Sequence, residues 1–260
     1  MSMIRVWAIV VRHLYNFRRS YDRLSDSIYW PVMDLIVWGL TSKWMASGSE
    51  IPDAALFVLT GVVFWQVVWR SNYEISVNLL EEFWNQNLAN IFSTPLKVSE
   101  WIGAVMLIGL IKNLLTIIVG VGGVWLLYSL NILSMGWWLL PFFFLLLISG
   151  WFMGFLASGL IIYHGQKIQT LAWTMGFLFA PFSAVFYPLE VLPSWAQMIS
   201  KTLPTSYIFE GMREVIRTGN MSWDLLVKSI VLNAIYLIAS IAFFIHMFEK
   251  RREKGLAKLD

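Results

Sequence analysis

Residues 137–162 read WWLLPFFFLLLISGWFMGFLASGLII and contain no aspartate, glutamate, lysine or arginine. A helix needs about 20 consecutive apolar residues to cross the hydrocarbon core of a bilayer. A helix that is apolar on every side belongs in a large protein core or in lipid. This stretch therefore predicts a membrane-spanning helix, and it decides the fold class of the chain.

The composition of the whole chain agrees with a membrane protein. Of its 260 residues, 58% are hydrophobic and 13% are charged, whereas soluble domains carry about 25% charged residues. The surplus apolar surface must therefore face lipid. The chain has no cysteine, which excludes disulfide bonds, thiolate nucleophiles and cysteine-ligated metal sites.

Further apolar stretches lie on both sides of the first. Together they predict an all-α polytopic membrane protein, a single transmembrane domain over residues 1–260 with six spans at 28–46, 54–76, 101–128, 137–162, 169–187 and 225–247. Residues 3–19 predict an amphipathic helix in the membrane interface, because Arg5, Arg12 and Arg19 recur every seven residues beside an apolar face. A solvated cationic tail is the alternative for this segment.

Lysine and arginine are distributed unevenly between the two sides of the predicted bundle. One side carries the N-terminal arginines, Lys97, Lys167 and the basic C-terminal segment, and the other side carries few basic residues, Lys43 and Lys201 among them. Loops rich in lysine and arginine stay in the cytoplasm. Both termini are therefore expected in the cytoplasm, and the expected location is the cell membrane of a prokaryote.

The segment between the second and third spans, residues 78–91, predicts a cytoplasmic amphipathic helix. Its apolar face would carry Leu80, Trp84, Leu88 and Ile91, and its polar side Glu81, Glu82, Asn85, Gln86 and Asn90. Acidic and amide side chains fit anionic lipid poorly, since lipid-binding helices are basic on the polar face. Docking to a cytoplasmic protein is therefore favoured over a position flat on the membrane.

A second unusual segment, residues 188–222, lies on the outer side. It is too polar to span the membrane and too apolar for a free loop, and Pro188, Pro193 and Pro204 interrupt it. Irregular backbone at membrane depth is tolerated only where protein backs it. The segment therefore predicts short re-entrant helices.

Asp34, Arg70 and Lys112 lie inside predicted spans, where charged residues are rare and functional by default. Asp34 and Arg70 fall at similar depths on consecutive spans, which predicts a structural ion pair. Lys112 would lie deeper and line a polar path for an anionic substrate, or serve a structural role.

Aromatic and small residues add two further expectations. The spans carry aromatic side chains that would line a translocation path or face lipid: Phe64, Trp65, Trp69, Phe177, Phe179 and Phe182. Small residues predict close helix packing; they are Gly120, Gly122 and Gly123 on the third span, and Gly150, Gly154 and Ser158 on the fourth.

The sequence gives little support for an enzymatic site. His13, His164 and His246 are scattered and have no metal-ligand spacing. Ser158 precedes His164, but no nucleophile-elbow pattern surrounds it. The chain also lacks the G-x-x-x-x-G-K-[ST] loop of ATP-binding sites. Driven transport would therefore draw its energy from a partner or from an ion gradient.

Four short motifs carry a resemblance to a known family. They are FYPLEVLPSW at 186–195, LPTSY at 203–207, EGMR at 210–213, and STPL at 93–96 after Glu81 and Glu82. Over nearly its whole length the chain resembles the membrane subunit of an ATP-binding cassette exporter of the type-2 permease family. That family includes polysaccharide, teichoic-acid and drug exporters.

The resemblance implies roles for several segments. Residues 78–91 would be the coupling helix that sits in a groove of the ATPase, and 3–19 the connecting helix. An outer gate would include Tyr187, Pro188, Glu190, Pro193, Pro204, Tyr207 and Arg213.

The resemblance also implies an assembly. A second permease copy, two ATPase subunits and membrane lipid would be the partners, with no nucleic acid. ATP and magnesium would bind in the ATPase, and this chain would hold no cofactor. The expected activity is ATP-driven export of a glycan, a lipid-linked molecule or an amphipathic substrate. An ion-gradient-driven transporter is the alternative, although the two halves show no matched pair of broken helices.

Overall fold

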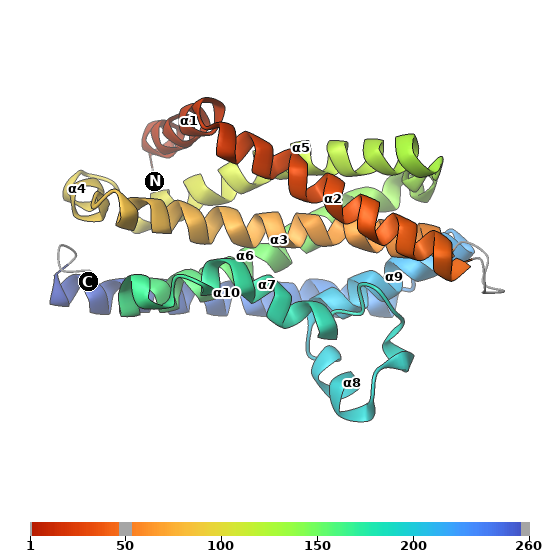
Figure 1. Cartoon of the computed structure of the whole chain (residues 1–260). Coiled ribbons are helices and arrows are strands. Elements are labelled where there is room, and N and C mark those ends of the chain that lie inside the picture. Colours follow the sequence, from red (N-terminus) through yellow and green to blue (C-terminus); the bar gives the residue numbers. More distant parts are fainter. Residues whose placement is uncertain (1, 47–53, 256–260) are drawn as a thin grey trace.

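The computed structural model of the chain describes residues 2–46 and 54–255. Figure 1 shows long helices running along an elongated bundle. Every regular element in the described part is helical, which confirms the all-α prediction. In chain order the elements are α1 (Met3–Arg19), α2 (Tyr21–Ala46), α3 (Ala54–Trp84), α4 (Leu88–Ser93), α5 (Val98–Tyr128), η1 (Ile132–Trp138), α6 (Leu139–His164), η2 (Gly165–Ile168), α7 (Leu171–Phe179), η3 (Ala180–Phe182), η4 (Leu189–Val191), α8 (Ser194–Ser200), α9 (Pro204–Thr218) and α10 (Trp223–Lys254).

Helix α3 is the central element, and it packs against α2, α5, α6 and α7. Its contact with α6 is close because α6 presents glycines there. A Cβ atom on Gly154 would lie 2.9 Å from Ile75 Cβ and 3.0 Å from the Asn72 carbonyl oxygen. Gly150 faces Ser71 and Val68 in the same way. The predicted small-residue packing on the fourth span is therefore confirmed.

Three helices of the described chain are long and apolar enough to cross a membrane, judged by length and composition. They are Val98–Tyr128, Ile132–Ile168 and Trp223–Lys254, which correspond to the third, fourth and sixth predicted spans. The first two predicted spans lie in α2 and α3, which are long but carry charged residues. The fifth is short, since the apolar helix there covers Leu171–Phe182 rather than 169–187.

The predicted helix over residues 78–91 is wrong in its boundaries. Helix α3 continues to Trp84, and α4 begins only at Leu88. Between them Gln86 adopts a left-handed conformation, with φ of 50°. Helix α3 continues this far because Glu81 and Glu82 are held by basic residues of α1 and α2.

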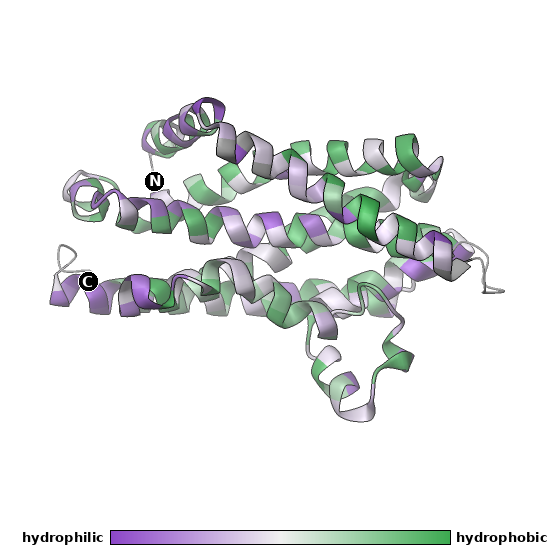
Figure 2. Ribbon diagram, viewed as in Figure 1, coloured by the Kyte–Doolittle hydropathy of each residue, from purple (hydrophilic) through white to green (hydrophobic). Residues whose placement is uncertain are grey.

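The two ends of the bundle differ in character. Helices α1 and α4 and both ends of the described chain lie at one end of the bundle, and α9 lies towards the other (Figure 1). Figure 2 shows hydrophilic residues gathered on α1 and on the last turns of α10. The sequence predicted a cytoplasmic location for both segments from their basic residues, and that location stays a prediction.

The segment 188–222 forms short helices, as predicted. Pro188 and Pro193 directly precede η4 and α8, and Pro204 is the first residue of α9. Proline suits these positions because its fixed φ fits the first turn and its missing N–H is not needed there. Gly219 caps the end of helix α9 with a φ of 79°, which few other residues adopt.

Candidate functional site

Helix α1 is fixed to the bundle by a charged contact near its start. Glu100 on α5 accepts two hydrogen bonds from Arg5, at 2.7 Å each, and one from the Ser2 backbone at 2.6 Å. Val6 and Val10 pack against α5 beside this pair. The predicted basic face of residues 3–19 is therefore engaged in part by protein, because a carboxylate of α5 holds Arg5.

Two further carboxylates hold the second half of α1 and the start of α2. Glu82 lies 2.9 Å from Arg12 and also accepts a hydrogen bond from Asn87. Glu81 forms an ion pair with Arg23. Both glutamates are buried, although they were expected on an exposed face. They therefore join α3 to α1 and α2, and they are not free to dock an ATPase.

The other residues of that predicted docking surface do reach solvent. Asn85, Gln86 and Asn90 are exposed around the turn between α3 and α4, and Trp84 is 45% exposed beside them. We call this turn, residues 84–95, the α4 corner. It lies at the end of the bundle that holds α1 and both described chain ends (Figure 1).

His13 lies among these charges and is almost completely buried. Its ring nitrogens lie 3.8 Å from Glu81 and 3.9 Å from Glu82. Burial, together with the positive charges of Arg12, Lys112 and Arg23, lowers the pKa of His13 to about 3. The two glutamates do not reverse this effect because each is already paired with an arginine.

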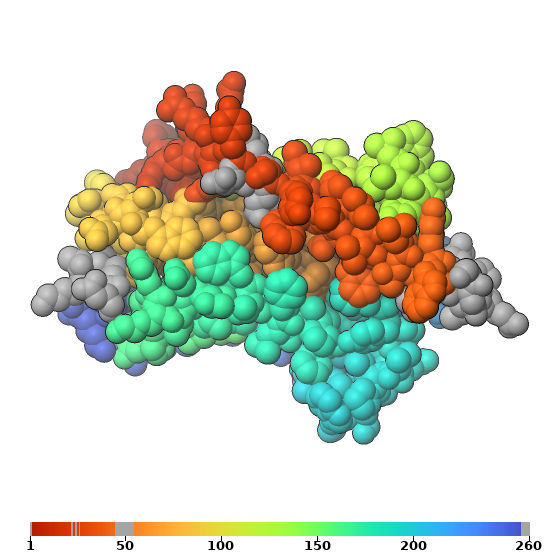
Figure 3. Space-filling view, viewed as in Figure 1, coloured from red at the N-terminus to blue at the C-terminus, as the bar shows by residue number. Residues whose placement is uncertain are grey.

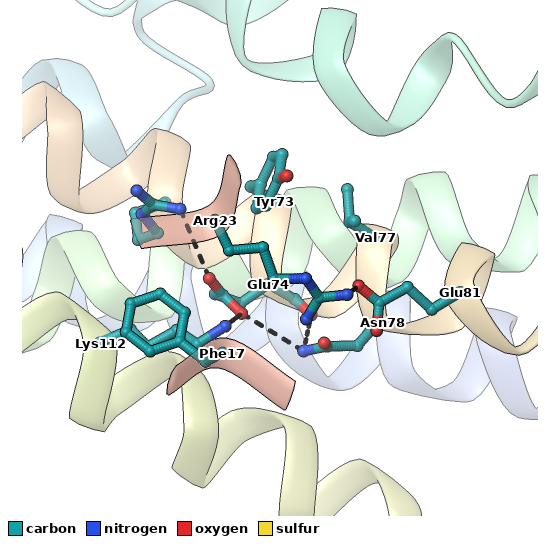
Figure 4. A pocket seen from close by; sticks show the side chains of 9 residues that line it. Phe17, Arg23, Tyr73, Glu74, Val77, Asn78, Glu81 and Lys112 are labelled. Carbon is teal, nitrogen blue, oxygen red and sulfur yellow. Dashed lines mark hydrogen bonds and ion pairs between the residues drawn. The ribbon is translucent and has the colours of Figure 1, made fainter. Parts of the chain in front are cut away.

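A third carboxylate, Glu74, binds two cations inside the bundle (Figure 4). Lys112 Nζ lies 2.6 Å from Glu74 Oε2, and Arg70 lies 3.5 Å from Glu74 Oε1, with all three side chains buried. The Phe17 ring of α1 lies over Lys112, 4.6 Å from Nζ. Lys112 is therefore part of the contact between α1, α3 and α5, as the structural alternative expected, and its role in a polar path stays a prediction.

The predicted pair of Asp34 with Arg70 is also corrected. Arg70 pairs with Glu74, one turn further along α3, and Asp34 accepts a hydrogen bond from Gln66. The prediction rested only on the equal depth of Asp34 and Arg70 in the membrane. The residue that reaches Asp34 is Gln66, one turn before Arg70 on α3. Asp34 thus faces a different part of α3 from the one expected.

Asp34 lines a cavity of about 410 Å³ between α2, α3 and α7. The other lining residues are Trp30, Trp65, Gln66, Trp69, Tyr73, Trp173 and Phe177. We call it the aromatic cavity. Figure 3 shows part of α3 at the surface between α2 and α7 on this face of the molecule.

The structure brings some of the predicted path residues together here. Trp65, Trp69 and Phe177 line the aromatic cavity. Phe64 faces a separate apolar groove, Phe179 packs on Phe152, and Phe182 packs on Trp195.

Sequence reasoning missed three aromatic residues of the cavity, Trp30, Tyr73 and Trp173. A signal for them existed: apart from Gln66, the cavity residues of each contributing helix lie four positions apart, at 30 and 34, at 65, 69 and 73, and at 173 and 177. Residues at that spacing share one helix face.

At the opposite end, Arg213 connects α9 to the chain that leaves η3. Its guanidinium donates to the carbonyl oxygens of Ala184, Val185 at 3.2 Å and Tyr187 at 2.9 Å, and it pairs with Glu210 at 3.0 Å. Glu210 in turn accepts from the Leu189 backbone at 2.7 Å. One buried arginine and one glutamate thus hold a stretch of irregular backbone against α9.

The other predicted gate residues surround this contact. Tyr187 donates to the Pro181 carbonyl and Tyr207 to the Lys201 carbonyl, at 2.7 and 2.8 Å. Glu190 and Pro193 are exposed, whereas Pro204 is buried at the start of α9. These contacts are structural; movement of a gate stays a prediction.

In the part of the chain that the structure describes, we find no site for metal binding or for serine–histidine hydrolysis. No group of three or more histidine, aspartate or glutamate residues could hold a metal ion there. Ser158 is completely buried, and His164 is exposed and contacts the Leu160 carbonyl.

Comparison with known proteins identifies the family of the chain. No curated protein matches the chain. The sequence pattern of the ABC-2 family transporter proteins matches residues 43–248. That range includes α3, α5, α6, α7 and most of α10, together with the α4 corner, most of the aromatic cavity and the Arg213 contact. The chain therefore belongs to the ABC-2 family of transporter proteins.

Proposed function

We propose that this chain is the permease subunit of an ATP-driven exporter with six membrane crossings. In this proposal two copies of the chain assemble with two copies of a separate cytoplasmic ATPase. The observation that carries the proposal is the α4 corner. It joins α3, the central helix, to α5, and it exposes amide side chains and Trp84 at the end of the bundle rich in hydrophilic residues.

The position of the α4 corner suits the transmission of force. A displacement of the corner would act directly on α3, which lines the aromatic cavity and carries the buried Glu74 and Glu82. Helix α1 would move with it, since Arg12 is paired with Glu82. Energy must reach this chain from outside because its sequence has no ATP-binding loop.

Co-purification tests the proposal. The full chain is extracted from its native membrane in a mild detergent, and we expect a soluble ATPase to accompany it in equal amount. A chain with Asn85→Arg and Asn90→Arg should lose the ATPase and stay folded, because both side chains are exposed. The matched control is Asn220→Arg, an exposed asparagine just after α9, where the ATPase should be retained.

Two results would contradict the proposal. One is a folded preparation without any ATPase that moves solute into liposomes on an ion gradient alone. The other is unchanged ATPase binding by the chain with both arginines in the α4 corner. The first result favours the gradient-driven transporter, and the second removes the α4 corner as the docking site.

A further inference from the structure

The aromatic cavity combines six aromatic rings with a single charged side chain. Trp30, Trp65, Trp69, Tyr73, Trp173 and Phe177 supply the rings, and Asp34 supplies the charge. The volume of about 410 Å³ is in the range of small-molecule sites. Apolar walls with one fixed polar group are also typical of such sites.

Asp34 forms no ion pair within the part of the chain that the structure describes. Its hydrogen bond comes from the neutral amide of Gln66. Arg70, the nearest cation along α3, contacts Glu74 and lies over the Trp69 and Tyr73 rings. A carboxylate in apolar surroundings is costly unless a cation accompanies it. Among the described residues, Asp34 is therefore the one charge of the cavity wall and has no ion-pair partner, while Arg70 is held by Glu74 and lies against two of the rings.

Aromatic faces and a carboxylate together favour one class of ligand. The faces of tryptophan and tyrosine attract cations through their quadrupole, most strongly when the cation is poorly hydrated. The hydrogen-bonding groups of the wall are Asp34, Gln66, the Tyr73 hydroxyl and the indole N–H groups of the four tryptophans. A neutral sugar could use these groups, but it would not neutralise Asp34. An anion would meet Asp34 and the negative faces of the rings.

We propose that the aromatic cavity binds the positively charged group of an amphipathic organic cation, with Asp34 as its counter-charge. This inference rests on the proposed transport function, because it names the substrate class that the permease would take. The rings would cover the apolar body of the ligand. Binding would also relieve the unpaired charge of Asp34, so that charge and shape select the same ligand.

Two probe ions of the same size and shape test the proposal. Tetraphenylphosphonium is a cation and tetraphenylborate is an anion, and binding of each to the purified full chain is measured by equilibrium dialysis in a non-ionic detergent. We expect the phosphonium to bind more tightly than the borate. Asp34→Asn should weaken phosphonium binding about tenfold, which corresponds to ~1.4 kcal/mol, and should not weaken borate binding. The control Asp224→Asn removes an exposed carboxylate outside the cavity and should change neither.

A second measurement applies if Asp34→Asn does not fold. The chain has no cysteine, so Phe177→Cys gives a single label site in the cavity wall. Phosphonium should slow its reaction with a maleimide, and borate should not. Equal binding or equal protection by both ions would overturn the proposal, as would phosphonium binding that is insensitive to Asp34→Asn. These assays need no ATPase, so their failure is distinct from a failure to co-purify the ATPase.

Discussion

Glu74 binds both Lys112 and Arg70, at 2.6 and 3.5 Å, inside a contact where all three side chains are buried. The carboxylate also lies 3.4 Å from the Asn78 amide. One anion on α3 thus serves two cations, one on its own helix and one on α5. Loss of the Glu74 carboxylate therefore affects two cations, whereas loss of the Lys112 ammonium leaves Glu74 with Arg70.

This inequality predicts unequal effects of mutation. Glu74→Gln leaves two buried cations without this carboxylate and should lower the free energy of unfolding by about 3–5 kcal/mol, the range for breaking a buried pair. Lys112→Met leaves Arg70 beside Glu74 and keeps the volume, so its effect should be clearly smaller. Thermal unfolding in a mild detergent measures both. An equal loss, or a larger loss for Lys112→Met, would contradict the arrangement in Figure 4.

A second prediction concerns the attachment of α1. Glu82→Gln removes the charge that holds Arg12 and should loosen α1 from the bundle. Val10→Cys, on the buried face of α1, is the reporter, because the chain has no other cysteine. Its maleimide labelling should be slow in the parent and faster with Glu82→Gln.

The matched control for that experiment is Ile4→Cys. Ile4 is 83% exposed on the same helix, so its labelling should be fast with or without Glu82→Gln. Unchanged slow labelling of Val10→Cys in the Glu82→Gln background would show that packing against α5 alone holds the helix.

The fold was predictable where lipid contact dictates the composition. The helices α5, α6 and α10 are apolar over a length that only a bilayer requires, so their spans could be predicted from hydropathy. The C-terminal end of α3 could not be predicted in this way. Its last two turns carry Glu81 and Glu82, which read as the polar side of a separate helix, and their burial depends on Arg12 and Arg23 of α1 and α2. A pattern within one helix gives its faces but not the neighbour that each face meets.

The candidate sites, too, could be predicted only in part. Equal depth suggested a partner for Asp34, yet the rotation of α2 and α3 places Gln66 against it. Three of the aromatic residues predicted to line a path or face lipid, Trp65, Trp69 and Phe177, line the aromatic cavity. The contribution of α2 was missed because Trp30 alone looks like an interfacial tryptophan, and its relation to Asp34 one turn later becomes meaningful only once α2 lies beside α3.

A third prediction concerns pH. Burial and the neighbouring cations lower the pKa of His13 to about 3, whereas a histidine in an unfolded chain has a pKa of about 6.5. The unfolded chain therefore binds the proton first as the pH falls. The stabilising contribution of neutral His13 is complete above pH ~6.5 and decreases below it, by about 1.4 kcal/mol for each pH unit.

The variant His13→Gln, whose glutamine cannot titrate, tests this dependence of stability on pH. The difference in thermal unfolding midpoint between the parent and His13→Gln should change between pH 7 and pH 5, with the parent losing more stability. A constant difference across that range would mean that burial does not shift the pKa of His13, and a parent that gains stability relative to His13→Gln would mean that Glu81 or Glu82 holds the histidine protonated.

The last prediction concerns the Arg213 contact at the opposite end. Arg213→Ala removes the donor for the carbonyl oxygens of Ala184, Val185 and Tyr187, and a buried acceptor left without a partner costs about 1–3 kcal/mol. Arg213→Lys should rescue the variant poorly, because an ammonium is a compact point charge and cannot reproduce the planar fork of donors. Arg217→Ala, one turn further along α9 and exposed, is the control. The readout is protease cleavage between residues 184 and 193, which should accelerate in both Arg213 variants and not in the control. Full protection in Arg213→Lys would mean that positive charge, rather than the geometry of the guanidinium, holds this backbone against α9.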